Sequence, residues 1–190
     1  MANQIIENKI FKGINYQDEP LVKGEYDNCT FLNCLFINAD LSGITFVDCF
    51  IDECDLSMAN IKNTVFRDVR FSKSKMVGLN FEECNNFLVS YSFEECFLNL
   101  ASFYKLKLKN TSFRNCNLQE VDFTEAVLTN SVFDNCDLSR AIFEQTNLEK
   151  ADLRTSYNYS IDPEMNRIKK ARFSRMGALG LLDKYNIEIE

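Results

Sequence analysis

An apolar residue recurs at every fifth position along most of this chain, with a small residue two positions before it. A period of five fits neither an α-helix, which repeats every 3.6 residues, nor a strand, which repeats every 2. Four such units make a square coil of twenty residues in which the apolar and the small residue point inward. Successive coils stack as parallel strands about 4.8 Å apart. The repeat therefore predicts an all-β solenoid, a quadrilateral parallel β-helix.

Phenylalanine and leucine alternate at the central position through the second half of the chain. With four units per coil, this alternation predicts two opposite faces of stacked rings and two of stacked leucines. Such ladders bury most of the apolar surface, which contributes about 25 cal/mol per Å² of apolar area to folding. The predicted core ladder contains Phe93, Leu98, Phe103, Leu108, Phe113, Leu118, Phe123, Leu128, Phe133 and Leu138.

The phase of the repeat is continuous, which predicts one solenoid over residues 1–175. The repeat is ragged in residues 1–25, and we expect this segment to form an N-terminal cap coil. The interval from Phe81 to Phe93 is two residues too long, so a two-residue bulge is predicted near 85–90. Residues 176–190 follow the solenoid as a separate cap.

All eight cysteines fall at the small inward position of their units. Residues twenty apart share a column, with two added across the bulge, so Cys34, Cys54, Cys96, Cys116 and Cys136 form one buried small column. Stacked cysteines lie within reach of a disulfide, but their side chains point in parallel, which is poor geometry for a bridge. We expect free thiols that pack as small apolar groups, and no zinc site.

The composition argues against an enzyme. The chain has no histidine, no glycine-rich phosphate loop and no nucleophile with an evident base. Its acidic pairs lie at outward turn positions, where solvated carboxylates are ordinary. We predict no catalytic residue, cofactor or metal. No signal peptide or membrane-length apolar run is evident, so we expect a cytoplasmic protein without membrane contact.

The segment from Met176 to Tyr185 is the one convincing helix of the sequence, and Asn186–Glu190 alternates like a short strand. This cap carries more apolar surface than one end of a solenoid requires. Two interpretations remain open, a monomer cap and a cap that also forms a two-fold dimer interface. The residues concerned are Met176, Leu179, Leu181, Leu182, Tyr185, Ile187 and Ile189.

The five-residue repeat resembles that of pentapeptide repeat proteins, which form right-handed quadrilateral β-helices. The C-terminal Leu-Gly-Leu-Leu-Asp-Lys-Tyr followed by Asn-Ile-Glu-Ile resembles the cap of the Qnr-type quinolone-resistance and gyrase-inhibitor group. That resemblance implies a short C-terminal α-helical cap, a homodimer joined through it, and a DNA-mimicking regulator of DNA gyrase or topoisomerase IV. The acidic net charge would repel nucleic acid, so we expect no direct contact with it.

Charge and surface residues leave a second function open. The net charge of −7 would suit a basic groove but is well below that of duplex DNA over a rod of this length. The alternative is an interaction scaffold with another protein partner. Its candidate surface is a set of apolar residues at nominally outward positions: Ile37, Met58, Val77, Phe97 and Leu100. Scattered surface apolar residues are the ordinary explanation of such a set.

Overall fold

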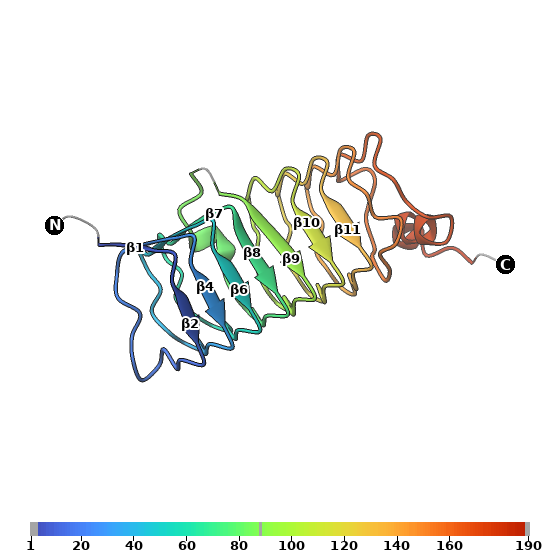
Figure 1. Ribbon diagram of the computed structural model, residues 1–190. Helices are drawn as coiled ribbons and strands as arrows, with labels where there is room; N and C mark the ends of the chain where they lie inside the picture. The colour runs from blue at the N-terminus through green and yellow to red at the C-terminus, as the bar shows by residue number, and fades with distance from the viewer. Residues whose placement is uncertain (1–3, 88, 189–190) are drawn as a thin grey trace.

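The computed structural model describes residues 4–87 and 89–188 and shows a straight rod of stacked coils with the termini at opposite ends (Figure 1). Each side of a coil is one five-residue unit, and after the corner residues most sides leave room for only three strand residues. The strands are β1 Ile5–Glu7, β2 Ile10–Lys12, β3 Glu25–Asp27, β4 Thr30–Leu32, β5 Thr45–Val47, β6 Phe50–Asp52, β7 Val65–Arg67, β8 Val69–Ser72, β9 Tyr91–Glu94, β10 Ser112–Arg114 and β11 Val132–Asp134.

All paired strands run parallel, in the orders β1-β3-β5-β7 and β11-β10-β9-β8-β6-β4-β2. Most strands pair with the strand twenty residues on, as in Phe11 with Phe31, and the offset is 22 where β8 pairs with β9, as in Val69 with Tyr91. The other two sides are held by isolated bridges. We name the four sides faces A to D by their inward residues, which in one coil are Tyr26, Phe31, Phe36 and Leu41.

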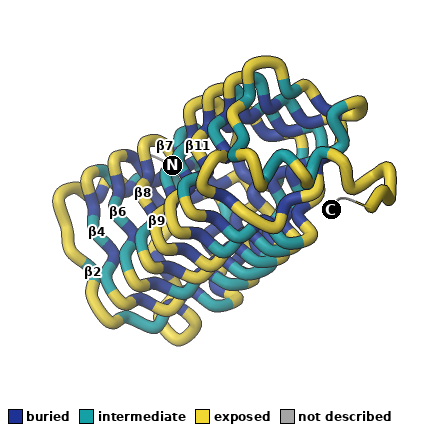
Figure 2. Tube along the Cα trace, turned by 90° about the vertical axis from the view of Figure 1, so that its right-hand side faces the viewer, coloured by how far each residue is buried: buried dark blue, intermediate teal, exposed yellow. Residues whose placement is uncertain are grey.

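The predicted fold class, a right-handed quadrilateral parallel β-helix, is confirmed. Buried residues line the inside of every coil and exposed residues lie at its corners (Figure 2). Phe113 on face B stacks between Phe93 and Phe133, with ring centroids 5.1 and 5.0 Å away. Phe103 and Phe123 stack likewise on the opposite face D, at 5.4 Å. All ten residues of the predicted ladder are buried.

The corners explain why the repeat has five residues. The last residue of most units has a positive φ, which turns the chain by about a right angle into the next face. Asparagine and glycine tolerate this left-handed region best, and asparagine is frequent there. Corner asparagines also bond along the rod, as in Asn135 Nδ2 to Asn115 Oδ1 at 2.9 Å. Met58 and Leu100 hold the same conformation with apolar side chains, at φ of 57° and 60°.

The two extra residues lie on face A between Asn85 and Ser90. The Asn85 amide still bonds the Thr64 carbonyl in the ordinary register, whereas the Ser90 amide bonds the Phe66 carbonyl. The segment bows out of the rod, at the green loop on its upper edge in Figure 1. Tyr91 enters the column of small residues and its ring fills the interior behind the bulge, 6.0 Å from the ring of Phe66.

All eight cysteines are buried and free. Several of their thiols donate to backbone carbonyls of the preceding unit and of the coil before, as Cys136 does to Asp134 and Phe113. Ser74 takes the same column and accepts a hydrogen bond from the Cys54 amide at 3.0 Å, so the column holds any small side chain that can bond along the rod.

The C-terminal cap differs from the expectation of an α-helix followed by a strand. It consists of two 3₁₀ helices, η2 Gly177–Leu181 and η3 Asp183–Tyr185, and residues 186–188 form no strand. Another short 3₁₀ turn, η1 Phe81–Glu83, precedes the bulge. Two glycines weaken helix propensity here, and Asn186 ends η3 in the left-handed conformation at φ 48°. Ile189 lies outside the described residues.

Candidate interaction surfaces

The apolar residues singled out on face C lie in adjacent coils. Phe97 belongs to the outward column that bridges Leu35, Asp55, Lys75 and Phe97. The Met58 side chain lies over Gly78, because a Cβ on that glycine would be 2.8 Å from Met58 Sδ. Met58, Phe97 and Leu100 are 62, 48 and 56% exposed, while Ile37 and Val77 are half-buried. Met58, Val77, Phe97 and Leu100 therefore form one strip, which we call the face C strip, with Ile37 at its N-terminal end.

Acidic side chains are concentrated on faces C and D. Between Asp18 and Glu144 these faces carry eleven carboxylates against five basic residues, whereas faces A and B have nearly balanced charge. Three of the carboxylates are paired with basic residues: Asp40 with Lys23 at 2.8 Å, Glu125 with Lys105 at 3.4 Å, and Glu120 with Arg140. The eleven are Asp18, Asp55, Glu120 and Asp137 on face C, and Glu19, Asp40, Glu82, Glu83, Asp122, Glu125 and Glu144 on face D.

The bulge forms one wall of an open groove of about 680 Å³ at the corner between faces A and B. Its lining includes Asn28, Asp48, Asp68 and Arg70, with Ser90 on the bulge side. The Ser90 hydroxyl donates to Asp68 Oδ1 at 2.6 Å, which fixes the bulge to the corner column. Within residues 4–87 and 89–188, no three cysteine, aspartate or glutamate side chains are grouped as a metal site would need.

Most of the buried thiols are poor candidates for chemistry. Cys34 is an exception in its pKa, which a hydrogen bond with Cys54 lowers to about 6, although its side chain is fully buried. Burial raises the pKa of Cys49 to about 12 and raises that of Cys84 further. A thiol is nucleophilic as its thiolate, so these groups are unreactive near neutral pH. Burial likewise raises the pKa of Tyr91 well above its ordinary value, and its hydroxyl has no hydrogen-bond partner among the described residues. The repeat does not predict that Tyr91 is buried, because the tyrosine occupies a position where the pattern has a small residue.

The cap residues divide into two groups. Leu181 packs against the core, whereas Met176, Leu179, Leu182, Tyr185 and Ile187 remain exposed. A shallow groove of about 260 Å³ lies among Leu179, Leu182 and Ile187. Lys184 Nζ joins the cap to the segment before it, at 2.8 Å from Asp162 and 2.7 Å from Glu164. None of the described helices is long and apolar enough to cross a membrane.

The geometry defines a solenoid whose exposed surfaces are its outer faces and its cap. Two family models match its sequence: pentapeptide repeats in eight copies over residues 51–85, and a pentapeptide repeat region over residues 86–157. Together they cover more than half of the chain, and the chain belongs to the pentapeptide repeat family. No curated protein gives a significant sequence match.

Solved structures with the same fold include QnrB1, described as a plasmid-mediated fluoroquinolone resistance protein. The full-length QnrB1 structure has 19% identity and a TM-score of 0.64, and the match covers 97% of this chain and 100% of QnrB1. A trypsin-treated QnrB1 variant matches at 22% identity and a TM-score of 0.49, over 98% and 100%. HetL from Nostoc sp. strain PCC 7120, involved in heterocyst differentiation regulation, matches at 16% and 0.32, over 90% and 87%.

Proposed function

We propose that this protein is a non-enzymatic binding rod, and that its partner is a bacterial type II topoisomerase, either DNA gyrase or topoisomerase IV. The observation that carries the proposal is the gathering of acidic side chains onto the adjacent faces C and D. A surface of this kind complements a basic groove and competes with DNA for it. The fold shared with QnrB1 over the whole of both chains supports the proposal.

The charge sets a limit on how close the mimicry is. Duplex DNA carries about one negative charge per 1.7 Å of its axis. Between Asp18 and Glu144, faces C and D carry a balance of −6, well below that density. We therefore propose competition for the basic DNA-binding groove through shape and moderate acidity, rather than a copy of the phosphate pattern.

A gyrase supercoiling assay with increasing protein, with and without a quinolone, tests the topoisomerase proposal. We expect either inhibition or quinolone protection at micromolar protein. The triple variant Asp122→Asn, Glu125→Gln and Glu144→Gln removes charge from face D and is expected to weaken the effect about tenfold or more. Its matched control, Glu94→Gln with Glu95→Gln on face B, should act as the unaltered protein does. A folded protein that neither inhibits nor protects contradicts the proposal.

The face C strip favours a second candidate, an interaction scaffold for another protein. Exposed apolar groups in adjacent coils are typical of partner sites. Phe97→Asn with Leu100→Asn removes most of this surface without touching the core. A partner that is retained by the unaltered protein and the face D variant but lost by this variant would assign the strip. Equal loss with both variants would contradict a separate role for it.

The cap supplies a proposed homodimer contact. The exposed side chains of Met176, Leu179 and Ile187 can pack on the same residues of a second copy about a two-fold axis. Met176→Ser with Ile187→Ser leaves Leu181 and the cap hydrogen bonds in place. The variant should lower the mass measured by light scattering if the cap joins two copies. An unchanged mass contradicts this contact.

A further inference from the structure

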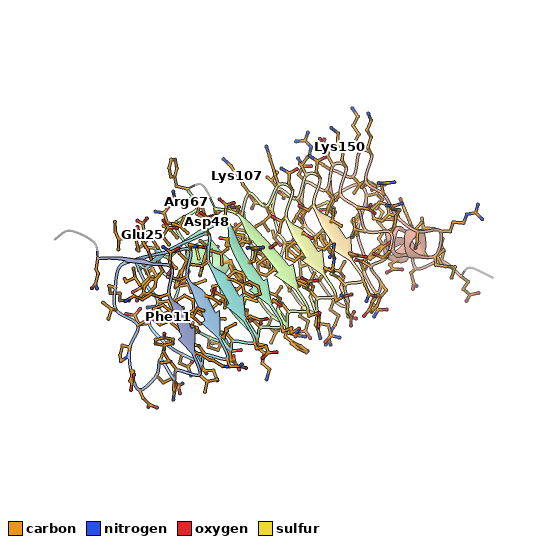
Figure 3. All side chains as sticks on the ribbon, viewed as in Figure 1. Phe11, Glu25, Asp48, Arg67, Lys107 and Lys150 are labelled. Atoms are coloured by element: carbon orange, nitrogen blue, oxygen red, sulfur yellow. The ribbon has the colours of Figure 1, made fainter. Side chains whose placement is uncertain are left out.

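Face A carries opposite charges toward its two ends. Figure 3 shows Glu25 and Asp48 toward the N-terminal end of the rod, then Arg67, and Lys107 and Lys150 toward the C-terminal end. The N-terminal half has five carboxylates against Arg67, and the C-terminal half has six basic residues against Glu149. The carboxylates belong to Glu7, Glu25, Asp27, Asp48 and Asp68, and the basic residues are Lys107, Lys109, Lys150, Arg167, Lys169 and Lys170.

The two halves share the same outward columns. Glu25 stands in register with Thr45 and Val65 through strands β3, β5 and β7. Bridges from Lys107 through Val127 and Asn147 to Arg167 continue that column beyond the bulge. Asp27 and Lys169 share the next column, and Asp48 and Lys150 share the corner column. Each charge therefore has a defined position across the face as well as along it.

Most of these charges lack an internal partner. Glu25, Asp27, Asp48, Lys150 and Lys169 form no ion pair with another residue in the described part of the chain. Arg167 pairs with Glu149 at 3.2 Å and is largely exposed. Unpaired charges segregated by sign on one surface are the arrangement that steers one protein onto another.

We propose that face A is a self-complementary interface, on which two copies of this chain pair antiparallel. The two-fold axis lies between the bulge and the coil of Leu108. It sets Glu25 against Arg167 of the other copy, Asp27 against Lys169, and Asp48 against Lys150. Symmetry repeats the three contacts at the other end.

The charge pattern selects this register. With the axis between the bulge and the coil of Leu108, Arg67 faces Thr129, Asp68 faces Asn130 and Glu149 faces Val47, so no like charges meet. An axis through the bulge itself would place Arg67 against Lys109 and Asp27 against Glu149. Like charges opposed across an interface weaken binding and disfavour that alignment.

The centre of the proposed interface is less charged than its ends. Val65 faces Val127 there, and Phe87 in the bulge is 73% exposed. In the selected register, Phe87 lies against Lys107 of the other copy, where an aromatic ring can contact both the alkyl chain and the ammonium group. The bulge of each copy then meets an ordinary coil instead of the other bulge.

A second copy fits face A better than other partners do. A polyanion would match the C-terminal half and be repelled by the N-terminal half, and a basic protein would do the reverse. An antiparallel copy of this face presents both charges in the right order. This interface is separate from the cap contact and from faces C and D.

Charge reversal with the full chain tests the proposal. The test uses the Met176→Ser, Ile187→Ser variant of the full chain, so that the cap contact does not contribute. Its sedimentation in about 50 mM salt should show a dimer, and about 500 mM salt should weaken it at least tenfold. In this variant, the further acid reversal of Glu25→Lys with Asp27→Lys and Asp48→Lys should give a monomer. A base-reversed variant, Lys150→Glu with Arg167→Glu and Lys169→Glu, should also be monomeric. An equimolar mixture of the two should restore the dimer, because both halves of the interface are then attractive.

Control variants separate this interface from the others. Asp122→Lys with Glu144→Lys changes face D by a similar charge and should not alter face A pairing. Met176→Ser with Ile187→Ser should leave the salt-sensitive association intact. A monomer at low salt, or a mixture that fails to reassociate while both variants remain folded by circular dichroism, overturns the proposal. A base-reversed variant that alone loses binding to a short DNA duplex, with no change of mass, would assign the C-terminal half to anion binding instead.

Cysteine cross-linking tests the register. Asp48→Cys with Lys150→Cys places the two new thiols opposite each other across the interface but several coils apart in one chain. Mild oxidation should therefore give a covalent dimer, since the native thiols are buried. Asp48→Cys with Asn130→Cys matches the axis through the bulge and should cross-link poorly. The reverse preference would contradict the proposed alignment.

Discussion

Gly180 lies directly against Tyr159: a Cβ built on the glycine would be 2.1 Å from the Tyr159 carbonyl oxygen. The Ile161 amide donates to the Gly180 carbonyl at 3.0 Å. The cap is thus held to the last coil by a backbone contact that leaves no room for a side chain.

Gly180→Ala should displace the cap, because the obstructing atom is backbone and cannot rotate away. We expect a loss of about 1–3 kcal/mol in unfolding free energy and faster hydrogen exchange at the Ile161 amide. Gly43→Asn is the matched control, since Gly43 has a positive φ with nothing within 4 Å and asparagine tolerates that conformation. Unchanged exchange at Ile161 in Gly180→Ala would contradict the close contact.

Adjacent residues of β10 should respond very differently to truncation. Phe113→Ala removes the middle ring of a buried stack and should cost about 3–5 kcal/mol in urea unfolding. Arg114→Ala removes an exposed side chain 3.8 Å from Glu94 and 3.6 Å from Asp134. Exposed ion pairs contribute little, so we expect a change within about 1 kcal/mol. Similar losses for the two variants would contradict the inward and outward assignment.

The cysteine column should accept serine but not a larger side chain. Cys116→Ser should change the unfolding free energy by no more than about 1 kcal/mol, because Ser74 already bonds within this column. Cys116→Val crowds the column and should cost about 1–3 kcal/mol. In the unaltered protein, a thiol reagent should label the cysteines only as fast as the solenoid opens. Rapid labelling of the folded protein would contradict their burial.

The pKa of Asp40 measures its ion pair with Lys23. The hydrogen bond from Lys23 lowers the pKa of Asp40 to about 2, from an ordinary value near 3.9. A depressed pKa stabilises the folded state above about pH 4, and that contribution disappears as the pH falls toward 2. Both side chains are about half exposed, so solvent limits the effect to about 0.2–1 kcal/mol.

Lys23→Met should therefore raise the pKa of Asp40 toward about 3.9 in a carboxyl NMR titration. Lys62→Met alters a lysine on the same face that does not contact Asp40 and serves as the control. An Asp40 pKa that stays near 2 in Lys23→Met would show that the corner hydrogen bonds from Ser42 and Asn60 hold it instead.

Leu100→Asn should stabilise the solenoid while removing part of the face C strip. Leu100 holds φ at 60° with its side chain exposed, and asparagine adopts that conformation at lower cost. We expect a gain of up to about 1 kcal/mol in unfolding free energy. A loss of stability would mean that the leucine makes packing contacts that outweigh its strained backbone.

The five-residue period alone predicts the inward ladders, the cysteine column and the place of the extra residues, because each follows from counting in fives and twenties. The period does not predict the burial of Tyr91, because that burial depends on the space that the bulge leaves in the interior. Tyr159, rather than Asn158, occupies the interior near the C-terminal end, since the repeat shifts by one residue there. The apolar spacing predicts an α-helix for the cap, but it takes no account of two glycines, of which Gly180 packs on the Tyr159 backbone and Gly177 on the Tyr159 side chain.

The sequence could predict both the acidic faces C and D and the opposite charges at the two ends of face A, but the net charge alone could not. A total of −7 conceals a surface on which opposite signs are kept apart. Writing the chain in rows of twenty, with two residues removed at the bulge, assigns each charge to a face. The structure adds which of these charges already have internal partners.

The bulge shows that face A accepts extra residues at one point without a change in the packing of the coils that follow. Two added residues change the offset between strands from 20 to 22, yet Phe71 still pairs with Phe93 and the next strands resume at 20. Only the positions of Asn85 and Ser90 have to be kept. A guest peptide whose ends meet these two residues can therefore be grafted there, so that the rod becomes a rigid carrier for a displayed sequence.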